Sequence, residues 1–121
     1  MTGGVSDLIP FVHVSDVARS IAFYGLLGFE VRGTYEHEGR LDWAALTSGD
    51  AQLMLAHADA PIDPRFQAVL FYLYADDLDG LRDHLLANGV VVGEIVDGSP
   101  GPEREMRLAD PDGYCLMIAA N

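Results

Sequence analysis

The chain has 121 residues, half of them apolar, which suffices for one ordinary domain with a buried core. Nineteen acidic residues against seven basic ones give a net charge of −12, which argues against nucleic-acid binding, because phosphates need Lys and Arg. Neither a run of 18 apolar residues nor a basic-then-apolar leader occurs, so we expect a cytoplasmic protein with no membrane partner.

The first half of the chain predicts the element order βαβββ. Residues 8–14 have the pattern of a strand, and residues 16–27 that of a helix with Val17, Ile21 and Tyr24 on one face. Three further strands are expected over 30–35, 41–47 and 51–57, joined by turns at 38–39 and 49–50. Because Pro10 lacks an N–H, it favours an edge strand or a strand exchanged with a partner chain.

The second half repeats this order after a Pro-containing linker at 58–66. Its predicted elements are a strand at 69–75, a helix at 78–88, a strand at 90–96, a loop at 98–103, a strand at 104–109, a turn at 110–113 and a strand at 114–120.

An internal duplication explains the repeated order. Residues 53–56 read Leu-Met-Leu-Ala and residues 116–119 read Leu-Met-Ile-Ala, and a shift of 61 residues aligns Asp16 with Asp77 and Gly28 with Gly89. We therefore predict one α+β domain over 1–121, made of two tandem βαβββ modules, about 6–57 and 67–121, that form a curved mixed sheet around a cleft.

Four phrases in this order resemble the vicinal oxygen chelate superfamily, and within it the glyoxalase and bleomycin-resistance protein group. They are VSDVARSIAFYGLLGF at 14–29, SGDAQLML at 48–55, ADDLDGLRDHLLANGV at 75–90 and REMRLADPDGYCLMI at 104–118. The resemblance spans nearly the whole chain and implies the fold of that group. It does not choose between metal enzymes and metal-free binding proteins, because the fold carries both.

The resemblance also implies where a catalytic metal would bind. In metal-dependent members the ligands come from the first and last strands of each module, which here correspond to Ile9, Met54, Leu70 and Met117. Ile and Leu have no donor atom, and thioethers suit Cu(I) rather than a hard divalent ion. We expect neither a metal nor another cofactor, no catalytic residue, and no glyoxalase or dioxygenase activity. A noncanonical site built from His13, His57 and nearby acids is the alternative.

Strand alternation then predicts which side chains face the cleft. The candidate ligand-binding residues are Phe11, His13, Trp43, Gln52, Met54, Tyr72, Tyr74, Met106 and Met117. Leu108 is expected to share their face and Arg104 to lie at the rim. Such an apolar, aromatic lining favours a flat ligand, and the acidity of the chain suits a cationic one.

Three functions follow from these residues. The first is a metal-independent homodimer that sequesters a planar or cationic compound, as the resemblance to bleomycin-resistance proteins implies, with antibiotic resistance as the associated role. The second is an enzyme of the superfamily whose metal site is noncanonical or absent, with Tyr72, Tyr74 or His13 as general acid or base. The third is an interaction module whose apolar face is covered by a partner chain.

Overall fold

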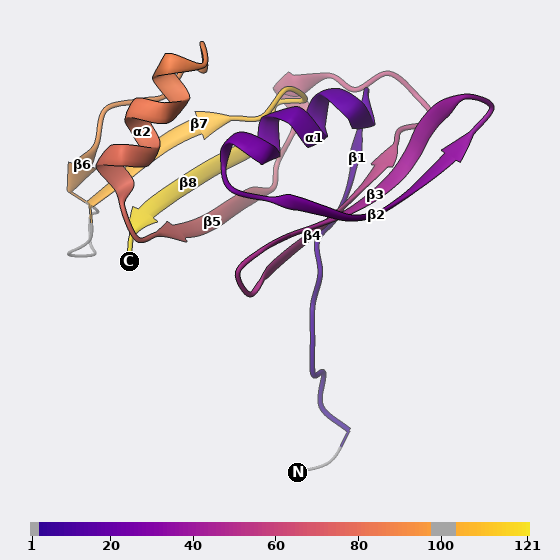
Figure 1. Cartoon of the computed structure of the whole chain (residues 1–121), viewed down its shortest axis with the longest axis horizontal. Coiled ribbons are helices and arrows are strands. Elements are labelled where there is room, and N and C mark those ends of the chain that lie inside the picture. Colours follow the sequence, from indigo (N-terminus) through magenta and orange to yellow (C-terminus); the bar gives the residue numbers. More distant parts are fainter. Residues whose placement is uncertain (1–2, 98–103) are drawn as a thin grey trace. The chain divides into compact units, whose positions relative to one another are not determined.

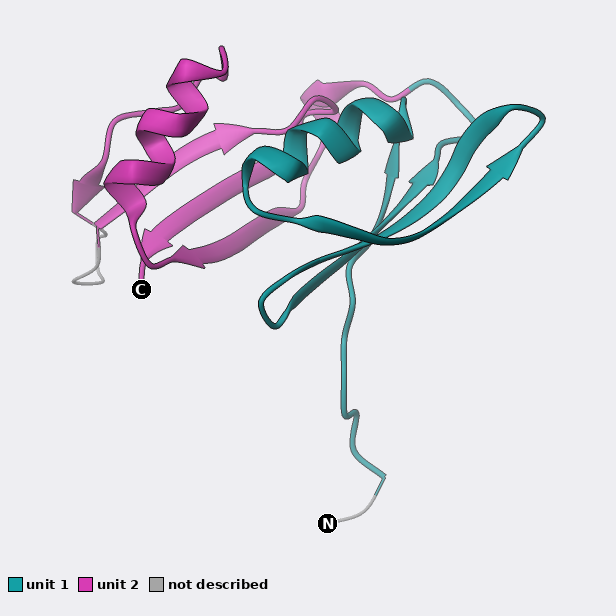
Figure 2. Cartoon of the chain, viewed as in Figure 1, with its two compact units in different colours: residues 1–61 teal, residues 62–121 magenta. Residues whose placement is uncertain are grey.

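The chain folds into two compact units, residues 1–61 and 62–121 (Figures 1 and 2). The computed structural model describes residues 3–97 and 104–121 of them. Within these ranges, no helix has the length and apolar character needed to cross a membrane.

Unit 1 has the predicted βαβββ order and one four-stranded mixed sheet (Figure 1). The strand order is β1-β4-β3-β2, with β1 parallel to β4 and the other neighbours antiparallel. β1 is thus an edge strand, as Pro10 predicts. The elements are β1 (Phe11–Val14), α1 (Val17–Leu26), β2 (Glu30–His37), β3 (Arg40–Ser48) and β4 (Ala51–His57).

Local sequence explains the boundaries of α1. The side chain of Asp16 accepts a hydrogen bond from the backbone N–H of Arg19 (3.1 Å) and caps the first turn. Gly28 follows the helix with a φ of +96°, a conformation that glycine adopts without steric cost. The preceding strand is shorter than expected, since it begins at Phe11 rather than at residue 8.

Unit 2 repeats the same arrangement, with strand order β5-β8-β7-β6 and β5 parallel to β8. Two four-stranded sheets therefore exist, one in each unit, where a single curved sheet was expected. The elements are a short 3₁₀ helix η1 (Pro64–Phe66), β5 (Leu70–Ala75), α2 (Leu78–Ala87), β6 (Val96–Asp97), β7 (Arg104–Ala109) and β8 (Cys115–Ala120).

The expected strand over 90–96 is wrong for most of its length. Strand pairing begins only at Val96, apart from one bridge between Val92 and Leu108. The carbonyl of Gly93 instead accepts a hydrogen bond from Arg82 Nε of α2 (3.0 Å). The predicted loop at 98–103 lies outside the described residues.

A compact turn joins β7 to β8. Asp110, only 5% exposed, accepts hydrogen bonds at Oδ1 from the backbone N–H groups of Asp112 and Tyr114, both at 2.9 Å. Gly113 has a φ of +87°, and a Cβ at this position would lie 2.5 Å from Cβ of Pro64. The turn thus depends on an aspartate acceptor and on a residue without a side chain.

In both units one face of the sheet is buried and the other is not. Alternate residues of the strands are buried on the helix side, as expected for a half-buried sheet. They are Val12, Val14, Ala44, Leu46, Leu53 and Leu55 in unit 1, and Met106, Leu108, Leu116 and Ile118 in unit 2. The residues between them form the opposite faces, where all candidate site residues except Met106 lie.

Candidate functional site

The exposed sheet face of unit 1, called here aromatic face 1, follows from the strand register. Directly opposed residues share a face, and Phe11, Met54 and Ala45 form one row across β1, β4 and β3. The next row contains His13, Ala56, Trp43 and Tyr35. Gln52 lies on the same face opposite Thr47. All five candidate residues of unit 1 share this face: Phe11, His13, Trp43, Gln52 and Met54. All except Gln52 have an aromatic ring or an apolar side chain.

Two ring contacts define the surface of aromatic face 1. The rings of Phe11 and His13, two residues apart on the edge strand, have centroids 6.0 Å apart at an interplanar angle of 56°. Phe11 is 48% exposed. The indole of Trp43 lies next to Gly33, where a Cβ would be 3.6 Å from Trp43 Cζ3. The indole thus packs against the β2 main chain at Gly33.

Aromatic face 2 is the corresponding surface of unit 2. One row consists of Tyr72, Met117 and Arg107 on β5, β8 and β7, and the next of Tyr74, Ala119 and Glu105. The rings of Tyr72 and Tyr74 are 5.5 Å apart between centroids. They are 49% and 64% exposed. This face therefore combines an aromatic pair with charged groups.

The charges of aromatic face 2 are arranged by a hydrogen bond across the sheet. The hydroxyl of Tyr72 donates to Oε2 of Glu105 (2.5 Å), so the carboxylate reaches across the strand that lies between them. The residue between Glu105 and Tyr74 on that strand is Ala119, which is fully buried although it lies on the exposed face. A small side chain at this position allows the carboxylate and the phenol to meet.

The register also identifies equivalent positions in the two modules. Phe11 opposite Met54 corresponds to Tyr72 opposite Met117, and each strand pair is parallel. The ring pair of Phe11 and His13 corresponds to that of Tyr72 and Tyr74. The duplication seen in the sequence thus places an exposed pair of rings on the edge strand of each unit.

The expectation for Met106 and Leu108 is wrong. Both lie on the helix side of β7, opposite Ile118 and Leu116, and Met106 is only 1% exposed. The cause is the turn. Four residues separate the paired Thr47 and Gln52 in unit 1, whereas five residues, 110–114, separate the paired Ala109 and Cys115 in unit 2. One additional residue moves the side chains of β7 to the other face.

Arg104 is displaced by the same change of register. Its guanidinium makes two hydrogen bonds to the carboxylate of Asp79 on α2, at 2.8 and 2.9 Å, rather than lying at the rim of the exposed face. These hydrogen bonds hold the pKa of Asp79 below its ordinary value and raise the pKa of Arg104. The two residues form a surface link between β7 and α2.

The positions implied for metal ligands do not fit a hard divalent ion. Met54 and Met117 lie on the two aromatic faces and offer only thioethers, while Ile9 and Leu70 offer no donor atom. Across residues 3–97 and 104–121, no group of three or more His, Cys, Asp or Glu side chains is placed to hold a metal ion. His13 and His57 lie on opposite faces of β1 and β4, because His57 is paired with Val14. The alternative site that combines them is therefore wrong.

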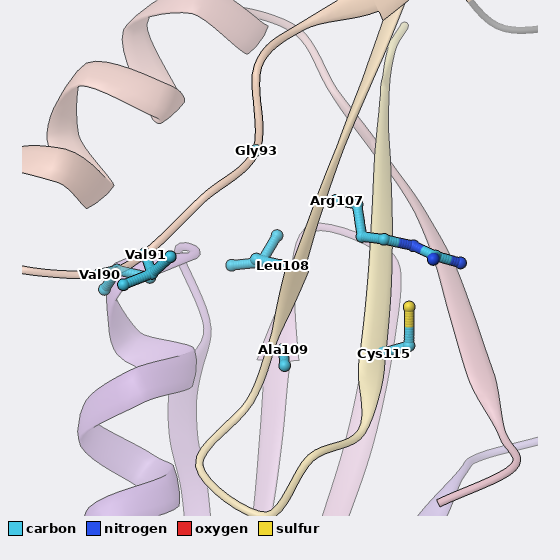
Figure 3. A pocket seen from close by; sticks show the side chains of 7 residues that line it. All are labelled: Val90, Val91, Gly93, Arg107, Leu108, Ala109 and Cys115. Atoms are coloured by element: carbon cyan, nitrogen blue, oxygen red, sulfur yellow. The ribbon is translucent and has the colours of Figure 1, made fainter. Parts of the chain in front are cut away.

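Each unit has a cavity beside its sheet. In unit 1, a cavity of about 410 Å³ lies between the start of α1, the β2–β3 hairpin and His57. In unit 2, a cavity of about 380 Å³ lies at the end of the β7–β8 hairpin (Figure 3). Figure 3 shows Leu108, Val90 and Val91 on one side of this hairpin and the side chains of Arg107 and Cys115 on the other. The sequence analysis predicts neither of these cavities and does not name Arg107 as a site residue.

Comparison with solved structures identifies the fold. The chain is similar to a bleomycin-binding protein solved in complex with bleomycin (22% identity, TM-score 0.77, covering 97% of this chain and 99% of that one). It is equally similar to a bleomycin resistance determinant encoded on the transposon Tn5 (22% identity, TM-score 0.77, 97% and 98%). A third match is TnmS3, an antibiotic binding protein from Streptomyces sp. CB03234 (23% identity, TM-score 0.75, 98% of both chains). The predicted glyoxalase/bleomycin-resistance fold is thereby confirmed.

Sequence comparison gives the family. A search of curated proteins found no match. The family model described as Glyoxalase/Bleomycin resistance protein/Dioxygenase superfamily matches residues 9–118, which include both modules. The chain belongs to the glyoxalase/bleomycin resistance protein/dioxygenase superfamily.

Proposed function

We propose that this protein binds a planar or cationic small molecule on its aromatic faces and sequesters it without metal or chemistry. The observation that carries the proposal is the exposure of the paired rings. Phe11, Tyr72 and Tyr74 are each about half exposed or more, on faces that also carry Met54 and Met117. Single exposed apolar residues are ordinary, whereas grouped aromatic rings favour a ligand.

The chemistry of these faces favours a flat, conjugated ligand. Aromatic rings stack or meet edge to face, and each such pair contributes about 0.5–1.5 kcal/mol beyond the area that it buries. Methionine adapts to irregular apolar surfaces and makes favourable contacts with rings. Of the similar proteins named above, one is a bleomycin-binding protein and another is an antibiotic binding protein, which supports an antibiotic-like compound as the ligand class.

The proposal includes a homodimer, in keeping with the bleomycin-resistance group that the sequence resembles. Light scattering coupled to size-exclusion chromatography would give the mass directly. A particle of twice the chain mass of 13.1 kDa is expected. A monomer at all concentrations would overturn this part of the proposal and leave ligand binding to be tested separately.

A thermal-shift and calorimetric panel tests ligand binding. Bleomycin serves as a cationic probe with a planar tail, and phenazine as a neutral planar probe. A ligand present at a hundred times its dissociation constant stabilises the folded state by about 2.7 kcal/mol. No stabilisation by any member of the panel would contradict the proposal.

A matched pair of variants localises the binding. Phe11→Ala removes a ring from aromatic face 1, whereas Phe66→Ala removes an exposed ring from η1, which belongs to neither face. We expect Phe11→Ala to weaken binding of a planar probe about tenfold, and Phe66→Ala to leave it unchanged. Equal effects of the two variants would contradict binding at the aromatic faces.

A further inference from the structure

The guanidinium of Arg107 differs from most others in this chain, since it has no partner among the residues that the structure describes. The chain has seven basic residues, all arginines, in an excess of acid. Five arginine side chains are each held by a carboxylate or a main-chain carbonyl: Arg32 by Glu30, Arg40 by Asp42, Arg65 by Asp63, Arg82 by Gly93 and Arg104 by Asp79. The main chain of Arg107 is paired within the sheet, but its guanidinium makes no hydrogen bond or ion pair with any residue in 3–97 or 104–121.

The position of Arg107 makes this absence informative. It lies in the row of Tyr72 and Met117 on aromatic face 2, and it is exposed. Figure 3 shows its side chain extended across β8 on the side of the Cys115 sulfur, away from Leu108. The guanidinium therefore lies on the side of the sheet that carries Cys115, Met117 and Tyr72.

The nearest acidic residue on the same face is already engaged. Glu105 lies two residues along β7 and shares the face of Arg107. Its carboxylate accepts the hydrogen bond from Tyr72. Glu105 makes no ion pair with Arg107, so the guanidinium keeps all of its donors for another acceptor.

We infer that Arg107 binds an oxyanion of the ligand, so that the ligand class is a planar aromatic compound bearing a carboxylate or a comparable anionic oxygen. A guanidinium presents a planar fork of donors that matches a carboxylate with two parallel hydrogen bonds. An aromatic body lying on Tyr72 and Met117 would bring such a group to the end of the row. This inference rests on the proposed function and narrows its ligand class.

The net charge of −12 does not oppose this arrangement. Charges separated by more than about 8 Å are largely screened at physiological ionic strength, so the nearest group decides the contact. On aromatic face 2 that group is Arg107, since Glu105 is turned to Tyr72. The arginine beside aromatic face 1 is Arg32, and its guanidinium is held by Glu30 and Thr47, so the anionic group is assigned to unit 2.

The test compares three fluorescent probes that share one ring system: anthracene-2-carboxylate, its primary amide and anthracen-2-ylmethylammonium. We expect the wild-type protein to bind the carboxylate about tenfold more tightly than the amide, the value for one charge-assisted contact at an exposed site. Arg107→Gln should bind the two with equal affinity. Arg104→Gln is the matched control, because it removes the same charge from the opposite face of the same strand. This variant should still bind the carboxylate more tightly than the amide.

The outcomes separate this inference from the proposed function. If the wild-type protein binds the carboxylate and the amide equally, or binds the ammonium probe more tightly than the carboxylate, the role of Arg107 is overturned while planar-ligand binding stands. The role of Arg107 is likewise overturned if Arg107→Gln still binds the carboxylate more tightly than the amide, or if Arg104→Gln loses this preference to the same extent. If no probe binds at all, the proposed function and the role of Arg107 both fail.

Discussion

Met54 and Leu55 are neighbours on β4 that the structure assigns to opposite faces, so truncating each to alanine separates packing from binding. Leu55 is fully buried, opposite Val12 and Ala44 on the helix side of the sheet. Met54 is half-buried on aromatic face 1, opposite Phe11 and Ala45. Leu55→Ala should therefore cost stability, and Met54→Ala should cost ligand affinity.

The magnitudes follow from burial. Leu55→Ala removes three carbon atoms, worth about 2.4 kcal/mol at about 0.8 kcal/mol per buried methylene. The cavity left under α1 adds to this, and the total should reach about 3–4 kcal/mol. That is a large share of the roughly 5–15 kcal/mol that stabilises a typical domain. Met54→Ala, at a partly solvated site, should cost less than about 1 kcal/mol.

Urea unfolding followed by circular dichroism measures both changes. With a slope of about 2 kcal/mol per molar urea, Leu55→Ala should lower the midpoint by about 1.5–2 M, and Met54→Ala by less than about 0.5 M. In the thermal-shift panel, Met54→Ala should weaken the response to a planar probe, whereas Leu55→Ala should keep it while folded. Equal destabilisation by the two variants would refute the assignment of faces in β4.

Three further predictions test other parts of the structure. Asp110→Ala removes the acceptor of one buried and one partly buried backbone N–H group and should cost about 1–3 kcal/mol in urea unfolding. Asp110→Asn keeps an oxygen and should restore most of this stability, and no difference between the two variants would contradict the role of the turn. Met106→Gln buries an amide on the helix side of β7 and should lower the free energy of unfolding by about 2–4 kcal/mol. Arg107→Gln, on the exposed side, should change it by less than about 0.5 kcal/mol. Similar losses of stability in the two variants would contradict the register of β7. Because the pKa of Asp79 is lowered in the folded state, its link with Arg104 stabilises the protein above the ordinary carboxyl pKa of 3.8 and is lost as the pH falls through the lower folded value. Urea midpoints of wild type and Arg104→Gln should thus differ at pH 6, and the difference should shrink as the pH falls below 3.8; a difference that widens with acid would contradict this sign.

The element order and aromatic face 1 could be predicted because their signals are local. Period-two alternation in β4 and the two-residue turn at Gly49 and Asp50 together determine which side chains of β3 oppose Met54. Trp43 thereby reaches the predicted face. The split into two separate sheets could not be read in the same way, because hydrogen bonding between strands far apart in sequence leaves no local pattern.

The face of β7 was predicted wrongly because the repeat was given more weight than the strand's own pattern. Extending the repeat from unit 1 placed Met106 and Leu108 on the exposed face. Their alternation with Glu105 and Arg107 predicts the opposite, since apolar residues of a half-buried strand point to the core. This alternation was the signal that could have identified Arg107 as a residue of the exposed face.

The additional residue in the turn between β7 and β8 gives the two modules different chemistry. With the register of unit 1, β7 would place Met106 and Leu108 beside Met117, and both aromatic faces would be apolar. The one-residue change instead buries these two side chains under α2 and brings Glu105 and Arg107 to the surface. Glu105 is then engaged by Tyr72, and Arg107 is left with its donors available. The duplication supplies each unit with a pair of exposed rings, and the difference in turn length supplies one of them with the means to distinguish ligands by charge.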